Sequence, residues 1–318
     1  MNRKCLYCYK SITQDSDFHE ACCIAFFGTI RTPILSYSLN QMNELAKDVV
    51  ERSIAVPGVQ PKLSLSMITD SLNKNNSGRL TVVGALGGNF IFKPPSEIYP
   101  EMPQNEHLTM RIAEAFGIRT VPSSLIHLQS GELAYITKRI DRTDNGDKIH
   151  MLDMYQILEA VDKYKSSLER IGNAIAMYSD NTLLDQLAFF ELCIFSFLTG
   201  NNDMHLKNFS MIKLESKWSL APAYDLLNVN LANPEDTEEL ALTLEGKKKK
   251  INRDHFEHLG LTLGLNQKQI ESVFKRFDKN KIIAKDWIKK SFLTKESKMK
   301  YSEILESNYR KIYGNNRL

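Results

Sequence analysis

The sequence lacks the features of a membrane protein and of a secreted protein held together by disulfides. No stretch approaches the roughly 20 consecutive apolar residues of a membrane-spanning helix, and the first residues, MNRKC, contain no apolar signal core. Only five cysteines occur in 318 residues, and four of them lie in the first 23 residues. That distribution does not suit a disulfide framework. We therefore expect a cytoplasmic protein with no membrane partner.

The sequence also lacks a strong excess of charge. The net charge is +3, which is too small to indicate nucleic-acid binding. The one basic run, Lys247–Lys250, has no aromatic residues among its lysines and is typical of a solvated turn. We expect no direct contact with nucleic acid. With 42% hydrophobic and 25% charged residues, the chain has the composition of a globular protein and is long enough for two lobes.

The N-terminal cysteines have the spacing of a metal site. Cys5 and Cys8 form a C-x2-C pair, and His19 and Cys22 follow ten residues later, with Cys23 as a substitute ligand. Thiolates and imidazole at this spacing suit tetrahedral Zn²⁺. The alternative is a set of reduced, buried thiols with an exposed histidine.

A loop with the sequence DMHLKN, residues 203–208, is the most informative feature of the chain. The apolar segment 182–199 predicts a helix that ends at Gly200, and strands are predicted at 209–213 and 218–220. The loop therefore lies between a buried helix and a hairpin, which can hold side chains in fixed positions. Asp225 follows the second strand.

The side chains of this loop suit phosphoryl transfer. Asp203 is the candidate general base, and Asn208 and Asp225 are candidate oxygen ligands for Mg²⁺. The alternative for Asp203 is a turn or helix-capping role. His205 is either a structural histidine or a donor to the transferred phosphoryl group, and Lys207 is a further candidate for stabilising its charge.

A small β lobe is predicted upstream of the loop. One helix, from about Gln104 to Phe116, ends at Gly117. The strands are predicted at residues 63–68, 80–83, 90–93, 121–128 and 133–139. Five antiparallel strands with one helix match the outline of a kinase small lobe, and the mostly helical remainder indicates an α+β fold.

Two features of this lobe could bind nucleotide phosphates. Lys93 ends an apolar strand and is either a phosphate ligand or an edge-strand lysine in solvent. Glu106 is either its ion-pair partner or an exposed acid in the first turn of a helix. The backbone amides of the preceding loop could also face phosphates. That loop includes Val56, Pro57, Gly58, Val59 and Gln60.

Motifs along almost the whole chain resemble the HipA-like toxin serine/threonine protein kinases, most closely the short HipT form. The motifs are FIFKPP at 90–95, NEH at 105–107, ITKRIDR at 136–142, GNNDMHLKNFS at 200–210 and APAYD at 221–225. The resemblance implies a two-lobed fold related to protein and phosphoinositide kinases, with a small antiparallel β lobe and a mainly helical large lobe. We expect the chain to be divided into a Cys-rich segment at 1–50, the small lobe at 51–142 and the large lobe at 143–318.

The resemblance also implies roles for individual residues. It places ATP on Lys93, the adenine on the backbone around Lys138 and Ile140, and Mg²⁺ on Asn208 and Asp225, with Asp203 as base. Autophosphorylation in the small-lobe loop is implied as well. Ser53 is the candidate acceptor, although Ala55 occupies the position expected from the motif.

The family's targets imply an aminoacyl-tRNA synthetase of glutamyl or tryptophanyl type as substrate, whose phosphorylation would arrest translation. The implied partners are a HipB-like DNA-binding antitoxin and a HipS-like small companion protein. Two other functions stay open from the residues. The first is a phosphoinositide or small-molecule kinase, and the second is a nucleotide-binding module that sequesters a partner without turnover.

Overall fold

The computed structural model describes residues 3–13, 15–52, 62–69, 78–83, 87–96, 98–99, 101–143 and 145–314. Contacts divide the chain into two compact units. Unit 1 comprises Met1–His107 and Val121–Lys148, and unit 2 comprises Leu108–Thr120 and Ile149–Leu318. The Cys-rich segment belongs to the same unit as the main sheet. In the part of the chain that the structure describes, no helix combines the length and hydropathy needed to cross a membrane.

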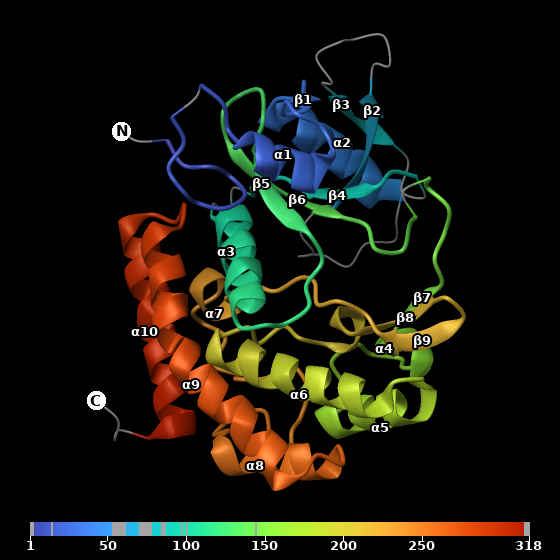
Figure 1. The fold of residues 1–318 in the computed structure, drawn as a ribbon, viewed down its shortest axis with the longest axis vertical. Helices are drawn as coiled ribbons and strands as arrows, with labels where there is room; N and C mark the ends of the chain where they lie inside the picture. The colour runs from blue at the N-terminus through green and yellow to red at the C-terminus, as the bar shows by residue number, and fades with distance from the viewer. Residues whose placement is uncertain are drawn as a thin grey trace. The chain divides into compact units, whose positions relative to one another are not determined.

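Unit 1 contains a six-stranded sheet and two helices (Figure 1). The strands are β1 (Ile34–Leu35), β2 (Leu63–Thr69), β3 (Gly78–Val83), β4 (Phe90–Lys93), β5 (Ser123–His127) and β6 (Leu133–Lys138), and the helices are α1 (Glu20–Phe27) and α2 (Leu39–Arg52). The strand order is β1-β3-β2-β4-β6-β5. The five predicted strands pair antiparallel. The short β1, which was not predicted, pairs in parallel with β3 at the edge.

Aromatic side chains join α1 to this sheet. Phe26 and Phe27 of α1 are buried, and their ring centroids lie 5.9 Å and 6.1 Å from that of Phe90 on β4. Phe92, two residues further along β4, points to the same face and is fully buried. Burial of these rings fixes the N-terminal segment to the strand that ends at Lys93.

The helix α3 (Met102–Ala115) contains the boundary between the units, which falls between His107 and Leu108. Unit 2 otherwise consists of helices and a three-stranded sheet. The strands are β7 (Met151–Asp153), β8 (Ser210–Leu214) and β9 (Lys217–Leu220). The helices are α4 (Met154–Ile157), α5 (Leu168–Tyr178), α6 (Thr182–Leu198), the 3-10 turn η1 (Leu206–Asn208), α7 (Val229–Ala232), α8 (Arg253–Thr262), α9 (Gln267–Lys290) and α10 (Lys295–Tyr313).

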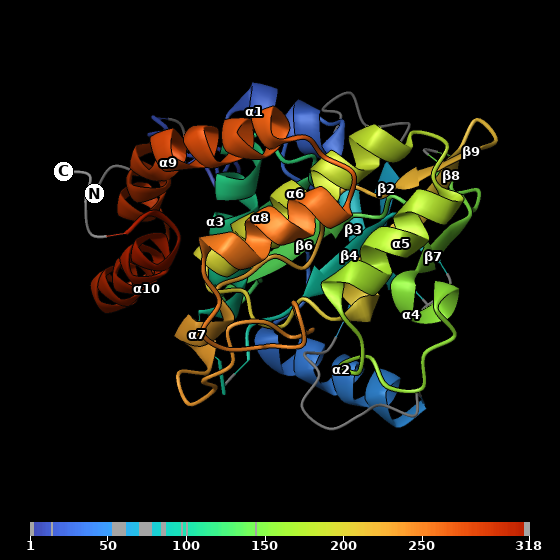
Figure 2. The same cartoon turned by 90° about the horizontal axis from the view of Figure 1, so that it is seen from below.

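The core of unit 2 is built around α6, which is buried along most of its length. A mostly apolar helix needs other elements to cover it, and α5, α8 and α10 all contact α6. In Figure 2, α5, α6 and α8 lie side by side. At the N-terminal end of α6, buried Asp185 accepts a hydrogen bond from the Leu220 backbone N–H at 2.7 Å. This bond fixes β9 to the helix that precedes the DMHLKN loop.

Candidate functional site

The loop with the DMHLKN motif begins where α6 ends. Gly200 has a φ of +71°, a left-handed conformation that suits the residue after a helix C-terminus. A Cβ at this position would lie 2.8 Å from Cγ2 of Ile304 and 3.0 Å from Oδ1 of Asn228. The Gly200 carbonyl also accepts the Val229 N–H at 3.0 Å. Glycine therefore lets the loop pack closely against the segment that follows Asp225.

Asp203 and Asn208 are joined within this loop. The side-chain amide of Asn208 donates to the Asp203 backbone carbonyl at 2.9 Å, and its side chain is buried. This bond fixes the orientation of the amide and leaves its oxygen available as a ligand. The Asp203 side chain accepts a hydrogen bond from the Tyr164 hydroxyl at 2.8 Å. Both polar groups are thus held in defined positions by their neighbours in unit 2.

Tyr164 is a site residue that the sequence analysis missed. Burial and the neighbouring Asp203 carboxylate raise the pKa of the Tyr164 phenol, so the hydroxyl stays protonated and donates at neutral pH. Its ring also lies edge-on to that of His205, with 5.1 Å between the centroids. Tyr164 precedes Asp203 by 39 residues, and no motif around it indicates this contact.

Asp225 follows the β8–β9 hairpin in a left-handed conformation, with a φ of +59°. Such a φ is uncommon outside glycine, although aspartate and asparagine tolerate it better than other residues. The segment before it is held in place by three hydrogen bonds. The Ala223 N–H donates to the Arg119 carbonyl at 2.8 Å, and the Tyr224 hydroxyl bonds to Ser210 Oγ at 2.5 Å and to the Lys207 carbonyl at 2.9 Å. The surroundings therefore dictate the backbone at Asp225.

His205 lies in the electrostatic field of both carboxylates. Burial lowers the pKa of His205, while the charges of Asp203 and Asp225 raise it and that of Lys163 lowers it further. The side chain is 5% exposed, and within the described structure its Nδ1 has no hydrogen-bond partner. The imidazole is therefore neutral at pH 7.

The residues named for magnesium offer the ligands that the ion prefers. Asn208 and Asp225 supply an amide and a carboxylate oxygen, and Mg²⁺ binds oxygen ligands. The charges of Asp203 and Asp225 both raise the pKa of His205, so each carboxylate is near enough to this histidine to influence it. Lys207 is exposed, and its ammonium lies 4.8 Å from the centre of the Tyr155 ring.

Lys93 and Glu106 form a buried ion pair in unit 1. The Lys93 Nζ lies 2.6 Å from Glu106 Oε1, and the two side chains are 5% and 1% exposed. The ammonium also lies 5.4 Å from the centre of the Tyr135 ring, which faces Lys93 from β6. Neither side chain is the solvent-exposed group that the sequence left as an alternative, and Glu106 is the ion-pair partner of Lys93. Binding of phosphate by Lys93 stays a prediction.

The other predicted nucleotide contacts are only partly described. The Lys138 N–H donates to the Pro122 carbonyl at 2.9 Å and is therefore engaged within unit 1. Ile140, two residues later, is half-buried. The loop from Val56 to Gln60 and the predicted phosphorylation site Ser53 lie outside the described residues.

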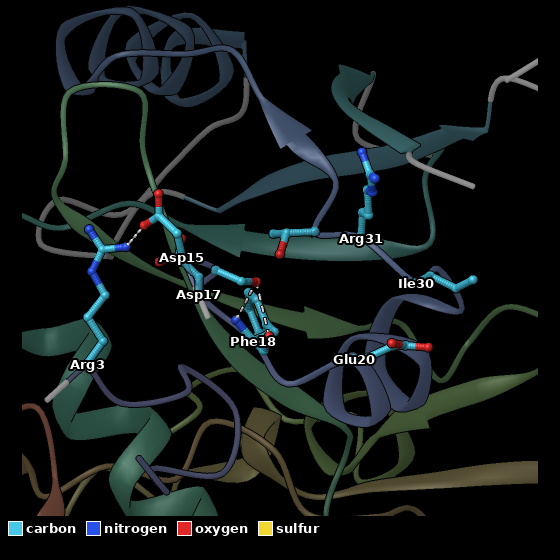
Figure 3. A pocket seen from close by; sticks show the side chains of 9 residues that line it. Arg3, Asp15, Asp17, Phe18, Glu20, Ile30 and Arg31 are labelled. Carbon is cyan, nitrogen blue, oxygen red and sulfur yellow. Dashed lines mark hydrogen bonds and ion pairs between the residues drawn. The ribbon is translucent and has the colours of Figure 1, made fainter. Parts of the chain in front are cut away.

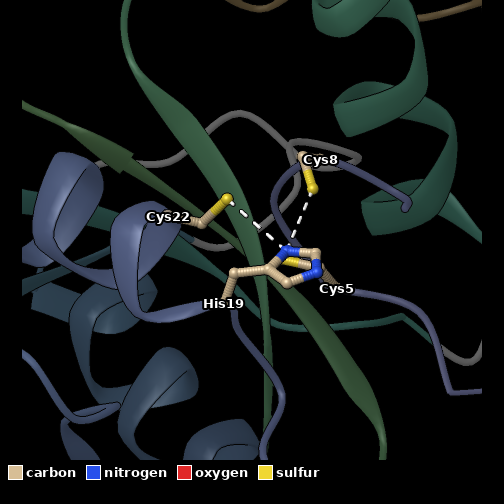
Figure 4. A group of neighbouring side chains, drawn as sticks. All are labelled: Cys5, Cys8, His19 and Cys22. Carbon is tan, nitrogen blue, oxygen red and sulfur yellow. Dashed lines mark hydrogen bonds between the residues drawn. The ribbon is translucent and has the colours of Figure 1, made fainter. Parts of the chain in front are cut away.

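The four predicted zinc ligands come together in unit 1. The ligand atoms of Cys5, Cys8, His19 and Cys22 all lie within 4.8 Å of one another (Figure 4). We call these four residues the Cys/His cluster. A separate pocket near the N-terminus contains none of the predicted site residues (Figure 3). Charges of both signs line it, including Arg3 and Asp15, which form an ion pair.

Comparison with known proteins identifies the family. The model of the HipA-like C-terminal domain matches residues 54–287. A Haemophilus influenzae protein named "Putative kinase" is 29% identical over 249 residues, which cover 69% of this chain and 70% of that protein. The "Serine/threonine-protein kinase toxin HipA" of Shewanella oneidensis is 27% identical over 215 residues, or 60% of this chain and 47% of the toxin. This chain thus spans about half the length of the Shewanella toxin.

Solved structures show the same fold. HipA of Shewanella oneidensis, in a complex with HipB and operator DNA, superposes with a TM-score of 0.67 at 22% identity, covering 82% of this chain and 65% of that one. The Helicobacter pylori proinflammatory kinase CtkA gives a TM-score of 0.52 at 16% identity, covering 70% and 87%. The predicted α+β kinase-like fold class is confirmed.

Proposed function

Because this chain belongs to the HipA-like C-terminal domain family, we propose that it is an ATP- and Mg²⁺-dependent serine/threonine protein kinase. We further propose that it acts as the toxin of a toxin–antitoxin module. The arrangement around Asp203 carries this proposal. Its carboxylate is held by the Tyr164 hydroxyl, and its backbone carbonyl orients the buried Asn208 amide. A base and a metal ligand are thus prepared in one loop.

In the proposed reaction, Asp203 accepts the proton of a substrate serine hydroxyl. The serine oxygen bonds to the γ-phosphorus of ATP, the bond from that phosphorus to the β–γ bridging oxygen breaks, and ADP leaves. The neutral His205 has a buried ring that suits a hydrogen bond to a phosphoryl oxygen. The exposed Lys207 is assigned a supporting electrostatic role.

Asn208 and Asp225 are the residues that would hold Mg²⁺, which neutralises phosphate charge when bound. We assign Lys93 to the ATP phosphates, since Glu106 and Tyr135 hold its ammonium in a fixed position. We assign the adenine to the backbone at Lys138 and Ile140. The Lys138 N–H already donates a hydrogen bond to the Pro122 carbonyl, so the Lys138 carbonyl is the candidate contact. The amides of the loop from Val56 to Gln60 complete this assignment.

The proposed substrate and partners rest on the resemblance to the family. We propose an aminoacyl-tRNA synthetase of glutamyl or tryptophanyl type as substrate, Ser53 as the autophosphorylation site, and the cytoplasm as the place of action. A HipB-like antitoxin is the proposed regulator, since the solved Shewanella HipA is in a complex with HipB and DNA. A HipS-like small protein is the second proposed partner.

A phosphate-transfer assay tests the proposal. The purified protein is incubated with γ-labelled ATP, Mg²⁺ and bacterial synthetases, and the labelled residues are identified by mass spectrometry. Asp203→Asn keeps an oxygen that can accept the Tyr164 hydrogen bond but cannot act as a base. We expect it to lower transfer by about 10²- to 10⁴-fold while the dissociation constant for ATP stays within about threefold of wild type.

Asp286→Asn is the matched control, because Asp286 lies on the surface of α9, where it forms an ion pair with Lys290. It should phosphorylate at the wild-type rate. When phosphoinositide vesicles are added to the same assay, label in lipid instead of protein would favour a phosphoinositide kinase. Toxicity that persists in Asp203→Asn cells would favour a module that sequesters a partner, and either result would contradict the proposal.

A further inference from the structure

The Cys/His cluster brings together ligands from two segments of unit 1. Cys5 and Cys8 lie in a turn that is closed by hydrogen bonds from the Cys5 N–H to the Lys10 carbonyl and from the Tyr9 N–H to the Cys5 carbonyl, both 2.9 Å long. His19 is the N-cap residue of α1, and Cys22 lies in its first turn. The turn and the helix end thus face each other and present three sulfurs and one imidazole.

The distances fit a tetrahedral metal ion. The Nδ1 atom of His19 lies 3.4 Å from the Cys8 sulfur and 3.8 Å from the Cys22 sulfur. Zn²⁺ with bonds of about 2.3 Å to sulfur and about 2.0–2.1 Å to nitrogen would place neighbouring ligand atoms about 3.5–3.8 Å apart. Figure 4 shows both sulfurs directed at the same ring nitrogen.

The tautomer of His19 is already that of a metal ligand. Its Nε2 atom lies 3.0 Å from the Ser11 backbone carbonyl. A carbonyl can only accept a hydrogen bond, so Nε2 carries the proton and Nδ1 presents its lone pair to the sulfurs. Ligating histidines commonly donate their second N–H to a backbone carbonyl in this way.

A disulfide would account for only two of the four residues of the Cys/His cluster. All five cysteines are free thiols, and pairing two of the three cluster cysteines would leave one sulfur and the imidazole without a role. Cys23, the neighbour of Cys22, is buried and lies 3.8 Å from the Thr29 hydroxyl. Its sulfur is therefore engaged elsewhere, and the cluster is a set of four.

We propose that Cys5, Cys8, His19 and Cys22 bind one Zn²⁺ ion that has a structural role in unit 1. Three thiolates and one imidazole are the soft and borderline ligands that select zinc, and four protein ligands complete its coordination. No position is left for water or substrate. The ion therefore takes no part in phosphoryl transfer.

The zinc ion fixes the turn that contacts the Lys93 region. Tyr9 sits in this turn with a φ of +62°, and its hydroxyl lies 3.0 Å from Nδ1 of buried His107. His107 directly follows Glu106, which holds Lys93. The metal-bound turn thus supports the first half of α3 through this buried hydrogen bond.

Metal analysis tests this proposal independently of kinase activity. The untagged protein, purified without chelators, is expected to contain about one zinc per chain by plasma mass spectrometry. Cys8→Ser and Cys22→Ser should contain almost none. Cys23→Ser is the matched control, because it changes the neighbouring thiol outside the cluster, and it should retain one zinc per chain.

Cobalt replacement covers the case in which the ligand variants do not fold. Wild-type protein refolded with Co²⁺ should show intense visible d–d absorption and a near-ultraviolet thiolate-to-cobalt band, as expected for a tetrahedral site with three sulfurs. A folded wild type with no zinc would overturn the proposal. Weak octahedral cobalt absorption, or equal zinc in Cys8→Ser and wild type, would also overturn it.

The supporting role of the turn is tested with Tyr9→Phe. This variant keeps every zinc ligand but loses the hydroxyl that contacts His107. We expect one zinc per chain and a free energy of unfolding that is lower than that of wild type. An unchanged unfolding free energy would remove the link from the metal-bound turn to α3.

Discussion

The Nζ atom of Lys93 lies 2.6 Å from Oε1 of Glu106, and both side chains are almost completely buried. A buried charge is costly unless an opposite charge and further contacts compensate it. The pair therefore holds Lys93 in one position on β4. It also connects that strand to α3, in which Glu106 lies four residues after the first residue, Met102.

Removing either partner of this ion pair should destabilise the protein. We expect Glu106→Leu and Lys93→Met each to lower the free energy of unfolding by about 3–5 kcal/mol, because each leaves one buried charge without its main partner. The double variant Lys93→Met/Glu106→Leu should regain most of that stability but not ATP binding. Urea unfolding and calorimetric titration with ATP measure the two effects. Additive losses in the double variant would contradict a coupled pair.

Loss of the Tyr164 hydroxyl should slow the reaction without changing nucleotide binding. Tyr164→Phe removes the hydrogen bond to Asp203, which is worth about 0.5–1.5 kcal/mol, or roughly two- to tenfold in rate. We expect kcat to fall by this factor and KM for ATP to stay constant. The control is Tyr178→Phe, at an exposed position at the end of α5, which should leave kcat unchanged.

Gly200 should be far less tolerant of alanine than Gly264. Both have a positive φ, +71° and +78°, but a Cβ at Gly264 meets no atom within 4 Å, whereas at Gly200 it meets Ile304 and Asn228. Gly264→Ala should lower the free energy of unfolding by about 1–2 kcal/mol, because alanine is strained in the left-handed backbone conformation. Gly200→Ala should lower it by about 2–5 kcal/mol, because the steric overlap of the new Cβ with its neighbours adds to the same backbone strain. Denaturant unfolding of the two variants gives the comparison, and equal costs would exclude a steric role for Gly200.

The protonation of His205 should make stability depend on pH. Burial holds its folded pKa below the ordinary value of about 6.5. As the pH falls through that value, the unfolded chain binds the proton before the folded chain does, so folding stability decreases. This loss continues until the pH passes the folded pKa. Lys163 adds to the effect, and Asp203 and Asp225 oppose it.

The measurement is urea unfolding of nucleotide-free and Mg²⁺-free protein between pH 7 and pH 5. His205→Gln has no proton to bind in this range, so its stability should fall less steeply than that of wild type. Parallel slopes for the two proteins would show that His205 does not have a depressed pKa. Comparing slopes, not absolute stabilities, removes the effect of the changed packing.

Local sequence patterns determined much of the fold. The mostly apolar segment that ends at Gly200 predicts α6, because a long segment rich in apolar residues indicates a buried helix and the glycine that follows indicates its end. The alternating pattern at residues 63–68 predicts β2 for the same local reason. In contrast, β1 has only two residues, and its pairing with β3 has no periodicity from which it could be predicted.

The sequence by itself determined the order of the motifs, the family, and the residue types available to the site. Only the tertiary structure decided which of these groups meet. Tyr164 reaches Asp203 across 39 positions, and Tyr9 reaches His107 across 98. Such contacts depend on how whole elements pack, since local spacing constrains only neighbours along a helix, strand or turn. The same reason explains why the pairing of Lys93 with Glu106 stayed undecided until the packing of β4 against α3 was known.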